Sequence, residues 1–358
     1  MAATFPCSAC GGELLFSPGQ QSLACPYCGS QQEVPSVEGA VEELDFDAHL
    51  EELAAAEVET EERLTVRCQS CAAETTFEPN VTSSECPFCG TKVVLTTTSK
   101  RLIRPGSLLP FRIDHRAARE AFLRWVRSRW FAPNALKQIA SHDRLQGVYL
   151  PFWTYDCRTT SRYRGLRGDE YQVTEMVTVS EGGRRVQRPR RVTKVRWTPA
   201  SGTVEDTFDD ILVLASESVD HRKADELEPW DLEALVPYDD RYLSGFRAES
   251  YAVDLGQGFQ RTQPQIEAAV RATVRQAIGG DRQQIHHLEV DCHDVTFKHL
   301  LLPVWISAYR FKSKIFQFLV NARTGEVQGE RPFSWVKITL AVLGGLVVVT
   351  LIILASSG

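Results

Sequence analysis

Eight of the ten cysteines in this chain form two copies of one pattern, a Cys-x2-Cys pair and, after fourteen intervening residues, a Cys-Pro-aromatic-Cys-Gly segment. Corresponding positions in the two copies are sixty-one residues apart, which marks an internal repeat. Four thiolates in two close pairs suit a tetrahedral Zn²⁺ ion. The pattern therefore predicts two zinc ribbons, each with one structural ion. The predicted ligands are Cys7, Cys10, Cys25 and Cys28 in the first ribbon, and Cys68, Cys71, Cys86 and Cys89 in the second.

Two other uses of cysteine fit this pattern less well. The doubled four-cysteine spacing disfavours disulfides. The Cys-Pro-x-Cys-Gly segment also occurs in iron-binding rubredoxins, but their two knuckles lie further apart, so zinc is favoured over iron. A site with four protein ligands leaves no open position for water or substrate. Each ion is therefore expected to stabilise a short segment that presents a rigid binding surface.

Charge distinguishes the partners that such a surface could bind. Residues 1–62 contain thirteen acidic residues and no Lys or Arg, so the formal net charge of −6 combines an acidic head with a mildly basic body. Nucleic-acid binding depends on neutralising phosphates, so the first ribbon is predicted to bind protein instead. Nucleic acid is not excluded at the second ribbon, which is flanked by Arg63, Arg67, Lys92, Lys100 and Arg101.

Residues 338–355 form an uncharged, apolar run of eighteen residues. Such a run predicts a transmembrane helix, placed at residues 335–355, with a buried core helix as the alternative. Arg331 and Lys337 lie on its N-terminal side, and no N-terminal signal peptide is recognisable, so the body is expected in the cytoplasm. Zinc-bound thiols also fit a reducing compartment. The sequence thus predicts a single-pass, tail-anchored protein whose last helix contacts membrane lipid.

The predicted organisation has five parts. Residues 1–35 form the first ribbon, residues 65–98 the second, residues 99–334 an α+β body and residues 335–355 the membrane helix. Residues 36–64 are an acidic linker that is predicted to be helical, with a solvated or disordered spacer as the alternative. A Pro-aromatic pair, a predicted helix and a Leu-Pro-x-Trp segment follow one another in the same order twice along the body. This repeat predicts two related units, 99–227 and 228–334. The alternative is that strands which begin with an apolar, proline-containing segment occur twice by chance.

Within the body, apolar stripes predict helices at 116–129 and 264–278, and Gly279 ends the second. Alternating patterns predict strands at 172–179, 185–197, 211–215, 287–290, 303–311 and 314–321. A glycine between two β segments, Gly325, predicts a hairpin turn over residues 321–327.

The strongest candidate for chemistry in the body is segment 286–299, which holds four of the eight histidines. On a strand, one face could hold a metal ion through His287, Glu289, Asp291 and His293. A polar, solvent-facing strand explains the same pattern. Cys157 and Cys292 have no Cys-x2-Cys partner; each is expected to be a small buried apolar residue, with a role as a nucleophile as the alternative. We find no protease, hydrolase or phosphate-binding motif, so no enzymatic activity is predicted.

A basic hairpin is predicted within residues 158–197, with Gly182 and Gly183 at its turn. Its second strand is a candidate contact surface formed by Arg184, Arg185, Arg188, Arg190, Arg191, Lys194 and Arg196. Anionic lipid or nucleic acid would complement this charge. An edge strand protected from aggregation by its charges is the alternative.

Several phrases resemble those of one bacterial family: the double CPxCG motif, LQGVYLPFWTYDC (145–157), DVTFKHLLLPVWISAYR (294–310), VNARTGEVQGERPFSW (320–335) and the terminal apolar run. This is a family of double zinc-ribbon, C-terminally anchored membrane proteins for which no reaction is established. Its members are often labelled as primosomal protein N′ (replication factor Y) helicases or as TFIIB-type zinc-ribbon proteins. The resemblance implies a protein of the bacterial cytoplasmic (inner) membrane. Helicase activity is not expected, because the chain has no nucleotide-binding loop.

Taken together, these features predict a non-enzymatic, zinc-binding, membrane-anchored cytoplasmic adaptor whose paired ribbons bind a protein partner. The first alternative is a membrane-tethered nucleic-acid binding protein, related to the zinc-ribbon part of the primosomal helicase and acting through the second ribbon and the basic hairpin. The second alternative is an enzyme with a site in the α+β body, formed by His287, His293 and Cys292.

Overall fold

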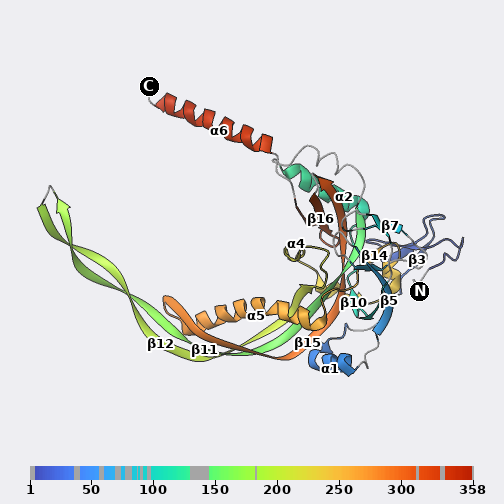
Figure 1. The fold of residues 1–358 in the computed structure, drawn as a ribbon, viewed down its shortest axis with the longest axis horizontal. Coiled ribbons are helices and arrows are strands. Elements are labelled where there is room, and N and C mark those ends of the chain that lie inside the picture. The colour runs from blue at the N-terminus through green and yellow to red at the C-terminus, as the bar shows by residue number, and fades with distance from the viewer. Residues whose placement is uncertain are drawn as a thin grey trace.

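The computed structural model consists of a body and a long, curved β arm that extends from it (Figure 1). It describes residues 5–35, 41–55, 60–68, 74–76, 83–86, 88, 92–94, 98–129, 145–181, 184–311, 314–330 and 335–356. One nine-stranded sheet runs through the body and the arm, with the central order β12-β11-β15-β10-β13 and with β4, β14, β16 and β17 paired beside it.

Three long strands form the arm: β11 (Gln146–Glu181), β12 (Arg184–Leu214) and β15 (Arg282–Phe311). β11 pairs antiparallel with β12 as far as the Glu181–Arg184 rung, but with β15 only as far as the Gly168–Arg282 rung. The arm therefore has three strands near the body and two strands beyond Gly168. β-Branched and polar residues alternate along it, which suits a sheet with at least one solvated face.

Helix α5 (Leu255–Ile278) covers one face of the three-stranded part of the arm (Figure 1). Ile266, Val270 and Val274 recur every four residues and are fully buried, so a single helical stripe faces the sheet. The Asp254 carboxylate accepts a hydrogen bond from the backbone N–H of Gln257 and caps the helix. The helix predicted at 264–278 is confirmed, and it begins earlier than predicted, at Leu255.

The body packs short strands and helix α2 (His115–Ser128) against the inner ends of β11 and β15. Ala118, Phe122 and Val126 of α2 are buried, which confirms the helix predicted at 116–129. The predicted hairpin is also confirmed: β16 (Lys314–Asn321) pairs antiparallel with β17 (Val327–Gly329), and Gly325 has a φ of +81° in the turn.

The remaining elements are short, except the 22-residue helix α6. They are β1 (Leu15–Ser17), β2 (Ser22–Ala24), β3 (Gln31–Glu33), β4 (Leu44–Asp45), α1 (Phe46–Ala55), β5 (Thr60–Arg67), β6 (Glu74–Thr76), β7 (Ser83–Glu85), β8 (Lys92–Val94), β9 (Thr98–Ile103), β10 (Ser107–Leu108), α4 (His221–Asp225), η1 (Leu232–Ala234), β13 (Val236–Pro237), η2 (Asp240–Leu243), β14 (Arg247–Ala248) and α6 (Trp335–Ser356).

The acidic linker contains helix α1, as predicted, and this helix packs onto the arm. The two residues before it, β4, pair with Thr296 and Phe297 of β15. Phe46 at the start of α1 is buried and lies edge-on to the ring of Tyr155, 6.2 Å between centroids. The described part of the linker is therefore a packed element of the fold.

The six predicted strand segments lie in four observed strands, β11, β12, β15 and β16. The alternating apolar pattern is interrupted along the arm because its outer face meets solvent and needs no apolar side chains. Backbone pairing with the neighbouring strand continues through these polar segments.

The expectation of two zinc ribbons requires correction. Among the described residues, one four-cysteine cluster is formed, by Cys7, Cys10, Cys25 and Cys28. In the second motif Cys68 and Cys86 are described and buried, whereas Cys71 and Cys89 lie outside the described residues. The fold that these residues establish is one four-cysteine cluster with a small three-stranded sheet, followed by an α+β body.

The prediction of a transmembrane helix at residues 335–355 is wrong. A bilayer core of about 30 Å requires about 20 apolar helical residues. Over the residues that the structure describes, no helix combines the necessary length and hydropathy to cross a membrane. The predicted single-pass location in the bacterial cytoplasmic membrane is wrong with it. The predicted contact of the last helix with lipid stays a prediction.

Candidate metal centre and neighbouring polar clusters

The first ribbon builds its four-cysteine cluster from two similar turns. In the first turn the N–H of Gly11 donates to the carbonyl of Cys7, and in the second the N–H of Gly29 donates to the carbonyl of Cys25. Gly11 and Gly29 have φ values of +74° and +72°, a conformation that glycine adopts without strain. The sheet β1-β2-β3 holds the two turns beside each other.

The geometry of the four sulfurs fits a zinc ion. All four Sγ atoms lie within 4.8 Å of one another, with Cys7 and Cys28 at 3.6 Å and Cys10 and Cys25 at 3.5 Å. Four ligands placed about 2.3 Å from Zn²⁺ at tetrahedral angles would lie about 3.8 Å apart. The cluster therefore suits one zinc ion, and all four positions would be filled by protein.

Backbone groups favour the thiolate form at the first cysteine of each turn. The N–H groups of Ala9 and Cys10 donate to the sulfur of Cys7 and lower its pKa to about 6. The N–H of Cys28 acts in the same way on Cys25 and lowers the pKa of that thiol. A metal ion binds thiolates and not thiols, so these turns prepare two of the four ligands for metal.

The strand side of the first ribbon packs against the body. Phe16 of β1 is buried against Tyr242, with 5.2 Å between the ring centroids, and its N–H donates to the carbonyl of Ser244. The Ser244 hydroxyl donates in turn to the carbonyl of Leu14, and the N–H of Gly19 donates to the carbonyl of Phe111. This ribbon is thus an integral part of the body and not a separate projecting module.

The metal-binding turns of the same ribbon lie on its outer side. Cys10 and Cys28 are exposed, and the side chain of Tyr27 between Cys25 and Cys28 is 79% exposed. The Tyr27 ring lies over Gly12, where an added Cβ would be 2.6 Å from the ring. Because Gly12 has no side chain, the Tyr27 ring can lie directly against the backbone of the metal-binding turn.

The second cysteine motif contributes to a different part of the core. Cys68, Cys86 and Phe88 are buried in one cluster with Leu150 and Leu302 of the long strands. The side-chain N–H of Gln317 on β16 donates to the carbonyl of Phe88 at 2.9 Å. Residues 86 and 88 are therefore attached to the sheet of the body.

The structure does not bring together the proposed enzyme residues of segment 286–299. His287 and His293 are exposed on one face of β15, whereas Cys292 lies on the opposite face and packs below α5. The acids on the exposed face are paired: Arg162 lies 3.6 Å from Glu289 and 3.3 Å from Asp291. His299 is buried and its Nδ1 lies 3.1 Å from the carbonyl of Ile103.

The predicted basic hairpin is the two-stranded end of the arm. In this part β11 and β12 pair without β15, from the Asp169–Arg196 rung outward. Arg185, Arg188, Arg190 and Arg191 are exposed there. Their ability to contact an anionic partner stays a prediction.

A buried lysine, which we did not single out in the sequence, organises the base of the arm. The Nζ of Lys298 on β15 lies 2.8 Å from Asp210, 3.0 Å from Glu43 and 3.7 Å from Asp156. Burial alone would lower the pKa of Lys298, but hydrogen bonds to Asp210 and Glu43 raise it above its usual value. Asp156, Asp209 and Asp210 are close enough together to hold a cation, and the lysine ammonium provides that charge.

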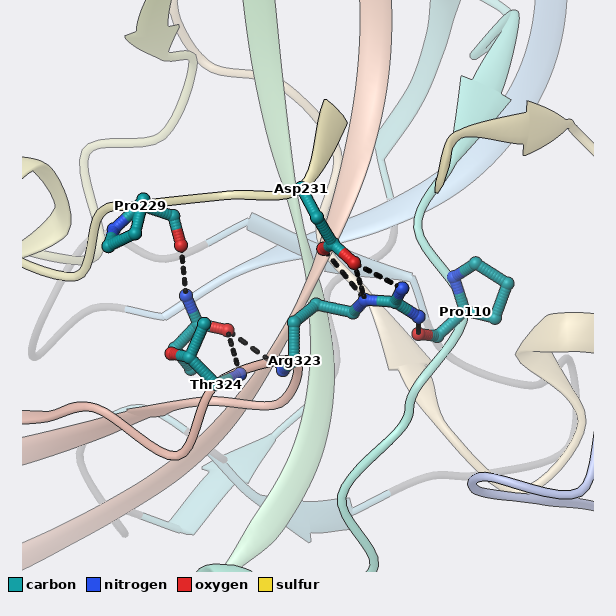
Figure 2. A network of polar contacts seen from close by, with 6 residues as sticks. Pro110, Pro229, Asp231, Arg323 and Thr324 are labelled. Carbon is teal, nitrogen blue, oxygen red and sulfur yellow. Dashed lines mark hydrogen bonds and ion pairs between the residues drawn. The ribbon is translucent and has the colours of Figure 1, made fainter. Parts of the chain in front are cut away.

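A second polar cluster attaches the β16–β17 hairpin to the body (Figure 2). The guanidinium of Arg323 donates from Nε and Nη2 to the carboxylate of Asp231 and from Nη1 to the carbonyl of Pro110. The side chain of Asn321 accepts from the N–H groups of Arg323 and Thr324 and donates to the carbonyl of Leu227. The sequence predicted this hairpin turn but not the partners that position it.

Comparison with other proteins gives one bacterial relative. No family model matches the chain, and no solved structure matches it. The chain is 24% identical over 337 residues to the uncharacterized protein YdjG of Bacillus subtilis (strain 168), an alignment that covers 93% of this chain and 91% of that protein. Similarity along nearly the whole of both chains indicates that this chain and YdjG are distant homologues.

Proposed function

We propose that this chain is a non-enzymatic, zinc-containing adaptor that binds a protein partner through the outer side of its first ribbon. One observation carries the proposal: the strand side of this ribbon is packed against the body, while the metal-binding turns and Tyr27 are directed outward. A four-thiolate site has no open position for catalysis, so its contribution is a rigid surface.

Tyr27 has the properties of an interface anchor. Tyrosine is enriched among the residues that dominate binding energy, because its ring offers apolar area and its hydroxyl a hydrogen bond. A bound zinc ion would fix the turn that carries it, and less conformational entropy would then be lost on binding. Residues 1–62 contain no Lys or Arg, so the partner is expected to carry basic residues around an apolar pocket.

The second cysteine motif is proposed to bind a second structural zinc ion. Its spacing repeats that of the first motif, and the buried positions of Cys68 and Cys86 suit residues that join the motif to the core. The proposal predicts about two zinc ions per chain in metal analysis of the purified protein. About one zinc ion per chain, unchanged when Cys68 and Cys86 are replaced by serine, would contradict it.

The protein-binding function is tested by partner capture with full-length protein. Because the Tyr27 side chain is exposed, Tyr27→Ala is expected to leave zinc content and stability unchanged. Met176→Ala is the matched control, since Met176 is also an exposed apolar residue, 59% exposed, but lies on the arm. We expect proteins that are retained by wild type and by Met176→Ala to be lost with Tyr27→Ala. Retention of the same proteins by all three would overturn the proposal.

A further inference from the structure

The two cysteines outside the ribbon motifs, Cys157 and Cys292, lie on neighbouring strands of the arm. Cys157 is on β11, and Cys292 is on β15, where it pairs with Thr159. Residues that pair directly across two strands point to the same face of a sheet. Cys157 and Thr159 are buried, whereas Arg158 between them is exposed, so Cys157 shares this face too. The two cysteines are therefore diagonal neighbours on the face that α5 covers.

Irregular strand pairing aims the two thiols at each other. Between Asp156 and Arg158 the register of β11 against β15 shifts, so that Cys157 stands opposite two residues of β15. One of these two, Asp294, has a φ of +52°. Such a bulge bends a strand and changes the direction of a side chain. Both cysteines are free thiols, and the thiol of Cys157 donates a hydrogen bond to the sulfur of Cys292.

The two thiols differ in exposure and in acidity. Cys157 is 2% exposed, whereas Cys292 is partly exposed and contacts Gln263, an exposed residue of α5. Hydrogen bonds from Cys157 and Gln263 lower the pKa of Cys292 to about 7. The hydrogen bond to Cys292, together with burial, raises the pKa of Cys157. An accessible cysteine of low pKa beside a second cysteine is typical of thiols that react with oxidants.

We propose that Cys157 and Cys292 are an oxidation site, at which hydrogen peroxide produces a reversible disulfide between β11 and β15. Such a modification goes beyond the adaptor function, since it uses neither the first ribbon nor Tyr27. The accessible Cys292 reacts first, and the buried Cys157 reacts second.

The reaction has two balanced steps. In the first, the Cys292 thiolate attacks one oxygen of the peroxide, the S–O bond forms while the O–O bond breaks, and the released hydroxide takes up a proton to become water. The sulfur is oxidised by two electrons to sulfenic acid, and the peroxide is reduced. In the second, the Cys157 sulfur attacks the Cys292 sulfur, the S–S bond forms while the S–O bond breaks, and hydroxide leaves with the thiol proton as water. A dithiol reductant restores both thiols by exchange.

Peptide mapping of the full chain after treatment with hydrogen peroxide tests the proposal. With the remaining thiols alkylated, trypsin releases Cys157 in residues 145–158 and Cys292 in residues 283–298, and each peptide contains a single cysteine. We expect one species in which the two peptides are joined, lighter than their sum by the two thiol hydrogens. Dithiothreitol should separate them.

Three results in wild type would overturn the proposal. The first is conversion of Cys292 to sulfinic acid without any joined peptides. The second is a disulfide from either cysteine to a ribbon cysteine in place of the expected one. The third is a protein in which both cysteines stay reduced at peroxide concentrations that oxidise exposed thiols of low pKa.

Two variants with matched serine substitutions test the order of the steps. In Cys157→Ser, Cys292 is expected to stop at sulfenic acid, which dimedone labels on the peptide of residues 283–298. In Cys292→Ser, Cys157 is expected to stay a thiol, because it is buried and its pKa is raised. Oxidation of Cys157 at the wild-type rate in Cys292→Ser, or no dimedone label in Cys157→Ser, would overturn the assignment of Cys292 as the cysteine that reacts first.

Discussion

The ammonium group of Lys298 on β15 lies 2.8 Å from the carboxylate of Asp210 on β12, so this pair spans the full width of the central strand β11. Asp210 has a φ of +52° and lies beside a register shift in the β11–β12 pair between Tyr155 and Cys157. The same ammonium contacts Glu43, just before α1. One buried cation therefore connects all three strands of the arm to the segment that precedes α1.

Replacing Lys298 with methionine should destabilise the protein by about 2–4 kcal/mol at pH 7, because a cluster of carboxylates loses its buried cation. The Lys298 side chain is 9% exposed, but the carboxylates of Glu43 and Asp210 are more exposed. Water can therefore partly solvate them in the variant, which limits the loss of folding free energy. Urea unfolding measures the change. Lys223→Met is the control, since Lys223 contacts one partly exposed acid, Glu330, and should cost less than about 1 kcal/mol. Equal effects of the two substitutions would contradict the role of Lys298.

The cost of Lys298→Met should also depend on pH. In wild type, the hydrogen bond from Lys298 lowers the pKa of Glu43 in the folded protein. The stability that this ionised Glu43 contributes is therefore fully present above the pKa of Glu43 in the unfolded chain, and it is lost as the pH falls through the lower pKa of the folded protein. In the variant the carboxylates repel one another and gain protons more readily, so acid stabilises the variant. The difference between the two proteins should therefore shrink from pH 7 towards about pH 4. A difference that grows on acidification would contradict this account.

Gly258→Ala should weaken the packing of α5 on the arm. An added Cβ would lie 2.2 Å from the Tyr155 hydroxyl and 2.8 Å from Trp153, and both side chains are buried. Such overpacking costs about 1–3 kcal/mol. Gly256, in the same helix, is the control because the nearest atom to its added Cβ is 3.6 Å away. Gly256→Ala should be neutral or stabilise by up to about 1 kcal/mol in thermal unfolding. If Gly256→Ala destabilised the protein more than Gly258→Ala, α5 would not approach β11 closely at Gly258.

Cys7→Ser should remove about one zinc ion per chain and destabilise the whole body, not only the ribbon, by several kcal/mol. The reason is that Phe16 and Leu14 of the ribbon belong to the same core cluster as Phe111 and Tyr149. Metal analysis and urea unfolding on one sample measure both effects. Cys292→Ser, which changes a cysteine outside the cluster, should keep the zinc content. Loss of zinc with unchanged unfolding of the body would mean that the ribbon is energetically independent.

Arg323→Lys should destabilise the β16–β17 hairpin by about 1–2 kcal/mol, because lysine keeps the charge but cannot donate to Asp231 and Pro110 at once. Water screens this ion pair, since the Asp231 side chain is 40% exposed, so the loss of stability is smaller than for a fully buried pair. The hydrogen bond from Arg323 lowers the pKa of Asp231 in the folded protein. The stability that this ion pair contributes is therefore fully present above the pKa of Asp231 in the unfolded chain, and it is lost as the pH falls through the lower pKa of the folded protein. Chemical unfolding should show a larger difference at pH 7 than at pH 3; a constant difference would exclude Asp231 as the partner that matters.

Local patterns in the sequence were sufficient for some features. The ligands of the first cluster could be predicted because each Cys-x2-Cys pair is closed by a turn of a few residues. Helices α2 and α5 and the β16–β17 hairpin were predictable because their signals, an apolar stripe, a cap or a glycine in the turn, lie within one element.

Tertiary structure decided the features that depend on residues far apart in the chain. Lys298 and Glu43 are 255 positions apart, and Ser244 and Leu14 are 230 positions apart. No local pattern shows that a lysine will be buried among carboxylates or that a ribbon will dock on the body. Gly256-Gln257-Gly258 has no recognisable meaning in the sequence, and the close approach of Tyr155 explains one of these glycines.

The sequence by itself therefore determined the first four-cysteine cluster, the α+β character of the body and the separation of acidic from basic segments. Only the tertiary structure decided that the strand pieces join into one long arm, with the β4–α1 segment at its base and the basic hairpin at its far end. The physical reason is that metal ligation and helix formation act over a few residues, whereas strand pairing, burial and charge separation depend on which distant segments become neighbours.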